Sequence, residues 1–159
     1  MTVSSPDLTG LLEQFLAYRP HYAVFLLVHP QVGRLMTAVQ EVQQQYAEWP
    51  HLALNRSLAP LLREVVPAQW PRMMPRLLAE ALQQHGPGPL LCSEIDLLFE
   101  PRLLLNPLGL FLEAGRHTSL IIAWPGTCDN NTLVYGVPEH AHYRPWPRAE
   151  LCDYCVVRL

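Results

Sequence analysis

The stretch YAVFLLVHPQVGRLMTAV, Tyr22–Val39, decides the fold that the sequence predicts. Its near-continuous apolar run, Tyr22 to Val28, is typical of a strand that is buried on both faces of a sheet. A short turn that ends in a glycine follows, and residues 34–48 then carry apolar side chains at helical spacing. A buried strand, a short loop and a helix together form the outline of a phosphate-binding site.

The rest of the chain alternates between helical and strand patterns, which indicates a layered α/β domain with a mainly parallel sheet. We expect one domain, 1–159, in which an N-terminal helix (1–20) precedes an α/β core (21–159). Helices are expected over 7–18, 34–48, 57–66, 71–85 and 106–115. Strands are expected over 51–55, 90–99 (a strand and its exit), 118–124, 132–138 and 151–159.

Composition restricts the function further. The apolar runs fall short of the ~18 residues that a membrane span needs. The N-terminus has no basic start and carries Asp7 and Glu13, so we expect no secretion signal and a cytoplasmic location. The net charge of -3 gives no general attraction to DNA, so any DNA contact is expected to be indirect or weak.

All 11 basic residues are arginines, and the chain has no lysine. A Schiff-base amine, a lysine general base and the lysine of a phosphate-binding loop are therefore all excluded. This composition bears directly on the loop after the first buried strand.

A working phosphate-binding loop has the pattern G-x-x-x-x-G-K-[ST], in which the lysine reaches the phosphates and the hydroxyl holds magnesium. If Gly33 is the second glycine, Arg34 takes the lysine position and Leu35 takes the hydroxyl position. His29 is the turn residue nearest to the first glycine, which leaves the loop about one residue short, and Pro30 removes an N–H donor. Two interpretations remain open: an ordinary strand–helix turn, or residual nucleotide binding by this loop. The residues argue against hydrolysis.

Ligands of parallel α/β sheets bind beyond the carboxyl ends of the strands, here 29–34, 55–57, 93–96 and 124–131. A nucleotide site also needs an acidic residue at the end of a neighbouring strand. Glu94 and Asp96 are the candidates, for metal binding or for activation of water, although Asp96 can also simply face solvent. Arg116, just before the 118–124 strand, is a candidate phosphate-sensing side chain.

Several blocks of the sequence follow one another from about residue 22 onward: the strand–loop–helix at 22–39, LNRSLAPLLREV, PRMMPRLLAEAL, LLFEP, NPLGLF, GRHTSLIIAWPG and LVYGVPEHAHYR. In this order they resemble the BrxF family of small P-loop-containing proteins from type 3 BREX bacteriophage-exclusion systems. The resemblance implies a three-layer fold of the P-loop NTPase (AAA/RecA-like) type, reduced in size, and a role in phage defence. Family members carry an intact loop and an aspartate at the end of the second strand, where this chain has Ser93.

Each of the remaining candidate groups has both a structural and a functional interpretation. Cys152 and Cys155 form a CxxC that is best explained as buried free cysteines, because residues three apart on a strand face opposite sides. His140 and His142, with Glu139 and Tyr143, form either a metal-binding pair or a surface loop on the sheet edge. The indole of Trp124 is expected either to stack on a nucleotide base or to pack in the core. Apolar surface for a partner protein is expected at Trp49, Trp70 and Trp146.

The sequence thus predicts a non-hydrolysing accessory subunit without a cofactor. The resemblance implies larger partners in a phage-defence complex, namely ATPase, methyltransferase or phosphatase-like components, and no membrane. The alternatives are a weak ATPase, in which Arg34 and Glu94 or Asp96 replace the missing groups with ATP and magnesium, and a nucleotide sensor without turnover.

Overall fold

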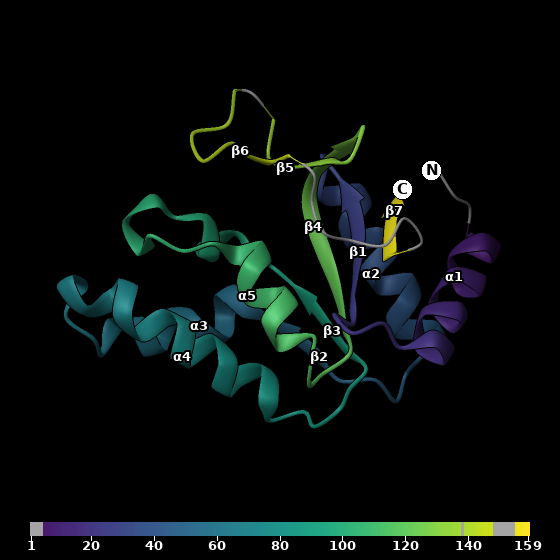
Figure 1. Ribbon diagram of the computed structural model, residues 1–159, viewed down its shortest axis with the longest axis horizontal. Coiled ribbons are helices and arrows are strands. Elements are labelled where there is room, and N and C mark those ends of the chain that lie inside the picture. The colour runs from purple at the N-terminus through teal and green to yellow at the C-terminus, as the bar shows by residue number, and fades with distance from the viewer. Residues whose placement is uncertain (1–4, 138, 148–154) are drawn as a thin grey trace.

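The computed structural model describes residues 5–137, 139–147 and 155–159 (Figure 1). Five parallel strands lie in the order β2-β3-β4-β1-β7, and β5 and β6 extend the sheet from the end of β4. The strands are β1 (Val24–His29), β2 (His51–Ala53), β3 (Leu90–Ser93), β4 (Leu120–Asp129), β5 (Thr132–Tyr135), β6 (Arg144–Trp146) and β7 (Val156–Arg158).

Helices cover both faces of the sheet and give three layers. In Figure 1, α3, α4 and α5 lie on one face, and α1 and α2 lie on the other. The helices are α1 (Ser5–Tyr18), α2 (Val32–Gln45), α3 (Leu54–Arg63), α4 (Trp70–Gln83) and α5 (Pro107–Ala114), with the 3-10 helices η1 (Pro67–Gln69), η2 (Asp96–Phe99) and η3 (Pro101–Leu103). The predicted fold, a reduced three-layer α/β domain of the P-loop type, is confirmed.

The continuous apolar run of β1 follows from this double coverage. Val24, Leu26 and Val28 pack into the core beneath α3–α5, whereas Phe25 and Leu27 pack into the core beneath α1 and α2. All five side chains are at most 2% exposed. Burial of each contributes on the order of 1.5–3 kcal/mol, so both cores depend on this central strand.

Four boundaries at the carboxyl edge of the sheet differ from the predicted ones, and each difference changes the site. Helix α2 begins at Val32 rather than at residue 34, and α3 begins at Leu54, so both helices follow their strands almost directly. The expected strand 90–99 ends at Ser93 and continues as two short 3-10 turns. The expected loop after residue 124 is instead strand, because β4 continues to Asp129. Of the predicted strand 151–159, residues 151–154 lie outside the described part of the chain.

The extension of β4 forms an antiparallel hairpin with β5 beyond the carboxyl end of the parallel sheet. Two features fix its geometry. The indole Nε1 of Trp124 donates a hydrogen bond to the carbonyl of Val134 at 3.0 Å. Gly126 lies so close to the same residue that a Cβ would collide with the Val134 carbonyl oxygen. The hairpin therefore needs glycine at this position.

We predict that Gly126→Ala destabilises the protein by about 3 kcal/mol, because the added methyl group meets backbone that cannot move without breaking the hairpin. Chemical denaturation of both proteins measures the change in the free energy of unfolding.

Gly33→Ala is the matched control. A Cβ at Gly33 meets no atom within 4 Å, and the residue lies in α2. This substitution should raise stability by roughly 0.5–1 kcal/mol through helix propensity. Equal effects of the two substitutions would contradict the close approach at Gly126.

Candidate functional site

The connection from β1 to α2 is two residues long, Pro30 and Gln31. Pro30 has no N–H, and the Gln31 N–H donates to Nδ1 of His29 at 2.9 Å. The Leu35 N–H bonds to the Gln31 carbonyl at 3.1 Å, which closes the first helical turn. A phosphate cradle needs several loop N–H groups that point at one ligand. Here neither loop residue offers one.

The predicted loop residues Gly33 and Arg34 lie inside the first turn of α2, not in a loop. Gly33 does not adopt the left-handed conformation that favours glycine, and its surroundings are open. Arg34 is exposed. The structure places His29, Pro30, Gly33 and Arg34 together without a loop cradle. The donors left for an anion are the solvent-facing guanidinium of Arg34 and the first N–H groups of α2.

Arg116 does not join these residues. It precedes β4, which runs parallel to β1 with Val24 opposite Leu120. Arg116 therefore lies at the amino end of the sheet, whereas His29 lies at the carboxyl end. Its guanidinium bonds to Glu113 of α5 at 3.1 Å. The expectation that Arg116 senses a phosphate bound at the loop is corrected by this placement.

Ser93 is the last residue of β3 and is buried. Its hydroxyl shares a hydrogen bond of 2.7 Å with Nε2 of His51 from β2. Burial lowers the pKa of His51, against an opposing effect of Glu94. A Ser–His pair can act as nucleophile and base. Ser93 is fully buried, however, so no substrate reaches its hydroxyl, and the pair is structural.

Glu94 and Asp96 leave β3 in different directions. Glu94 adopts a left-handed backbone conformation (φ 51°) and forms an ion pair with Arg56 of α3 at 3.1 Å. The turn is fastened to α3 by Asn55, whose N–H donates to the Glu94 carbonyl at 2.8 Å. The Asn55 side-chain oxygen accepts from the Leu97 N–H at 2.9 Å. These bonds aim Asp96 away from the β1–α2 turn and towards β5.

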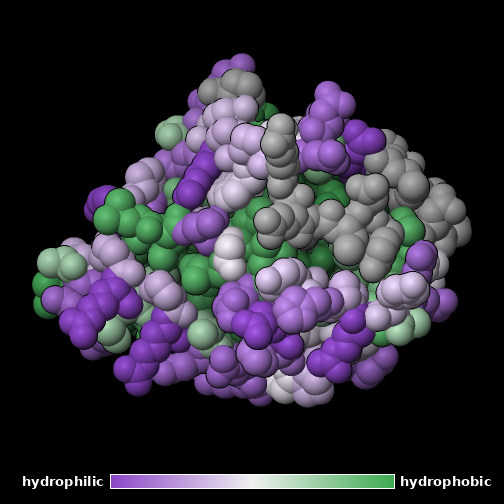
Figure 2. Space-filling view, in the orientation of Figure 1, coloured by the Kyte–Doolittle hydropathy of each residue, from purple (hydrophilic) through white to green (hydrophobic). Residues whose placement is uncertain are grey.

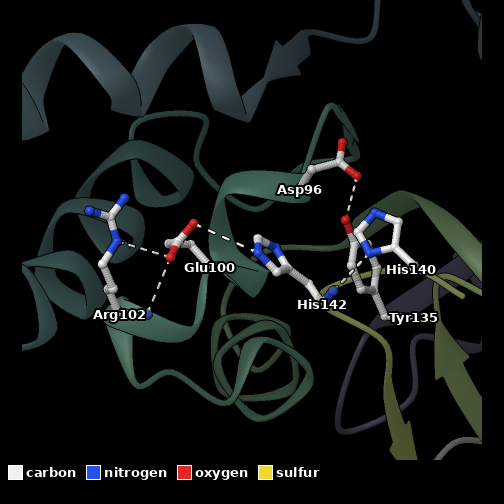
Figure 3. A network of polar contacts seen from close by, with 6 residues as sticks. All are labelled: Asp96, Glu100, Arg102, Tyr135, His140 and His142. Carbon is white, nitrogen blue, oxygen red and sulfur yellow. Dashed lines mark hydrogen bonds and ion pairs between the residues drawn. The ribbon is translucent and has the colours of Figure 1, made fainter. Parts of the chain in front are cut away.

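Asp96 is one wall of an open cleft of about 490 Å³ between η2 and the β5–β6 segment. Figure 3 shows the phenol of Tyr135 pointing at Asp96, and the hydroxyl donates to Oδ1 at 2.7 Å. Burial, together with Asp96, raises the pKa of Tyr135 well above its ordinary value, so the hydroxyl keeps its proton. The lining residues are Asn55, Ala59, Asp96, Leu97, Glu100, Tyr135, His140 and His142.

Glu100 carries the second carboxylate of the cleft. Its Oε1 accepts from Nε of Arg102 at 3.0 Å, and this bond lowers the pKa of Glu100. Its Oε2 lies 3.9 Å from Nε2 of His142, too far for a hydrogen bond (Figure 3). The His142 N–H donates to Nδ1 of His140 at 2.9 Å, so the two histidines form a tight turn beside the carboxylates.

The two histidines lie in the surface segment between β5 and β6, which agrees with their interpretation as part of a surface loop on the sheet edge. Across the residues that the structure describes, no group of three or more His, Cys, Asp and Glu side chains is placed to hold a metal ion. Of the predicted CxxC, Cys155 is buried, and Cys152 lies outside the described residues. Burial raises the pKa of the Cys92 thiol to about 12, which leaves it inert.

Trp124 is fully buried and packs edge-on against Phe99, so the core interpretation is confirmed. The other three tryptophans are half-buried. The indole of Trp49 stacks on Tyr46 at 3.9 Å, Trp70 donates to the Val65 carbonyl, and Trp146 donates to Asn106. Most of their apolar surface is thus used within the fold.

Sequence reasoning found Asp96 and both histidines but did not connect them, and it missed Tyr135 and Glu100. Asn55 belongs to 55–57, which the sequence predicts as a ligand-binding position only because these residues follow a strand. The missing signal was the continuation of β4, which folds the β5–β6 segment back over η2. A strand that continues through Trp-Pro-Gly has no clear pattern in the sequence.

Comparisons of the chain with protein-family models, with curated proteins and with solved structures gave no match. Among the described helices, none has both the length and the apolar character of a membrane span.

We predict that lowering the pH destabilises the protein because of His51. The folded state holds the pKa of His51 below the ordinary value of about 6.5, so the unfolded chain takes up the proton first as the pH falls. The free energy of unfolding should therefore decrease below about pH 6.5 and level off below the folded pKa.

His51→Asn should flatten this pH dependence, as measured by urea denaturation at several pH values. His117→Asn, at an exposed position, should retain it. An unchanged slope in His51→Asn would rule out the proposed linkage.

Proposed function

We propose that this chain is a non-hydrolysing accessory subunit that acts through protein–protein contacts in a bacterial anti-phage system of the BREX type. The observation that carries the proposal is the two-residue connection between β1 and α2. It leaves neither a cradle for phosphates nor a hydroxyl for magnesium, since Leu35 is buried in the core. The phage-defence context rests on the sequence resemblance alone.

Exposed apolar side chains support a docking role. Leu104, directly after η3, is 81% exposed and adopts a left-handed conformation (φ 53°). Its neighbours Leu103 and Leu105 are buried and hold it outward. Both the exposure and the backbone conformation are unfavourable for a leucine in an isolated protein.

Val66, just before η1, and Leu61, in the last turn of α3, add further apolar surface, with exposures of 68% and 44%. Trp70 of α4 lies between the two segments, because it bonds to the Val65 carbonyl and stacks beneath Arg102. Figure 2 shows hydrophobic residues gathered at this end of the molecule, where α3, α4 and the η3 segment lie in Figure 1. Apolar surface of this kind is typical of protein interaction sites.

We predict that Leu104→Asn abolishes phage protection while the purified protein remains as stable as wild type or becomes slightly more stable. Asparagine tolerates the left-handed conformation, and no packing is lost at an exposed position. Phage plating in the native host and thermal denaturation of the purified protein measure the two effects.

Arg34→Ala is the control from the degenerate loop, and it should protect as well as wild type. Two results together would establish the weak ATPase instead. Arg34→Ala would lose phage protection, and the wild-type protein would release phosphate from ATP in a reaction that Glu94→Gln abolishes. A melting temperature that ATP raises and Arg34→Ala returns to the unliganded value would establish the sensor.

A further inference from the structure

The cleft beside β5 holds two carboxylates whose positions are fixed before any ligand arrives. Asp96 Oδ1 is occupied by the Tyr135 hydroxyl, and Tyr135 is itself held by stacking on Phe99 at a ring distance of 3.6 Å. Within the described part of the chain, Asp96 Oδ2 has no partner. This oxygen is therefore an oriented acceptor that faces open space.

Glu100 presents a second acceptor on the same cleft. Arg102 takes Oε1 and keeps the carboxylate ionised at neutral pH, whereas Oε2 has only His142 nearby, at 3.9 Å. Arg102 binds Glu100 from the side opposite His142, as Figure 3 shows, so its charge does not fill the space between the two carboxylates. The cleft is thus negative at its polar end when the histidines are neutral.

The rest of the lining suits a side chain with an apolar stem and a flat polar head. Leu97 and Ala59 form an apolar wall, and the rings of Tyr135 and His140 meet edge to face at 5.4 Å. An anion would face two carboxylates without a free cation in the lining. A guanidinium, by contrast, matches carboxylate geometry, stacks on rings and binds through charge-assisted hydrogen bonds.

We propose that this cleft binds the arginine side chain of a partner protein, with the guanidinium between Asp96 and Glu100 and the stem along Leu97 and Ala59. The inference deepens the proposed function and rests on it, since docking supplies the ligand. The volume of about 490 Å³ accommodates one such side chain together with part of the adjoining backbone.

The test titrates the full-length protein with acetyl-Gly-Arg-Gly-amide and, in parallel, with the same peptide containing citrulline, an uncharged isostere of arginine. Calorimetry or NMR should give a Kd on the order of 1 mM for the arginine peptide and at least about tenfold weaker binding for the citrulline peptide.

Asp96→Asn keeps an acceptor for the Tyr135 hydroxyl but removes the charge, so it should weaken binding about tenfold with the fold intact. Asp129→Asn is the matched control, because Asp129 forms an exposed ion pair with Arg158 outside the cleft, and its binding should match wild type. Equal binding of both peptides, no binding of either, or unchanged binding by Asp96→Asn would overturn the inference.

These outcomes are separate from those that test the proposed function. The peptide titration contains no nucleotide, so an active ATPase would refute the accessory role without touching the peptide result. Absence of peptide binding would refute the arginine cleft while the Leu104 and Arg34 experiments stand.

Discussion

The direct passage of β1 into α2 is the constraint on which the rest of the structure depends. Proline removes one of the two available loop N–H groups, and His29 takes the other. As a result, Gly33 and Arg34, which were expected in a phosphate-binding loop, lie in the first turn of α2. The fold keeps its central strand and its two cores, while neither residue of the β1–α2 connection directs an N–H group at a ligand.

What remains polar at the carboxyl edge of the sheet lies on the other side of β4. The turn after β3 is fixed by Asn55, and the continuation of β4 brings Tyr135 and two histidines over it. A close backbone approach at Gly126 and the indole of Trp124 define the angle of this extension. The cleft is thus formed by the extension of β4 and not by β1, so it is physically separate from the β1–α2 turn.

The sequence predicts the fold well because its signals are local. An unbroken apolar run such as Val24–Val28 needs cover on both faces. Asn106 caps the start of α5, where its side-chain oxygen accepts from the Gly109 N–H at 3.2 Å. The site is less predictable because it depends on where strands end. Ser93 ends β3 early, Trp124 does not end β4, and Arg116 lies at the wrong edge of the sheet. These outcomes depend on tertiary contacts that no periodicity encodes.

The most direct test of the central claim is a titration of the 15N-labelled protein with magnesium-ATP, in which the backbone amides of Val32, Gly33, Arg34 and Leu35 are followed by NMR. Because the first turn of α2 has no cradle, these resonances should stay in place at millimolar nucleotide. A saturable shift of these four amides, at a concentration that leaves the remaining resonances unmoved, would show a working phosphate site and contradict the account.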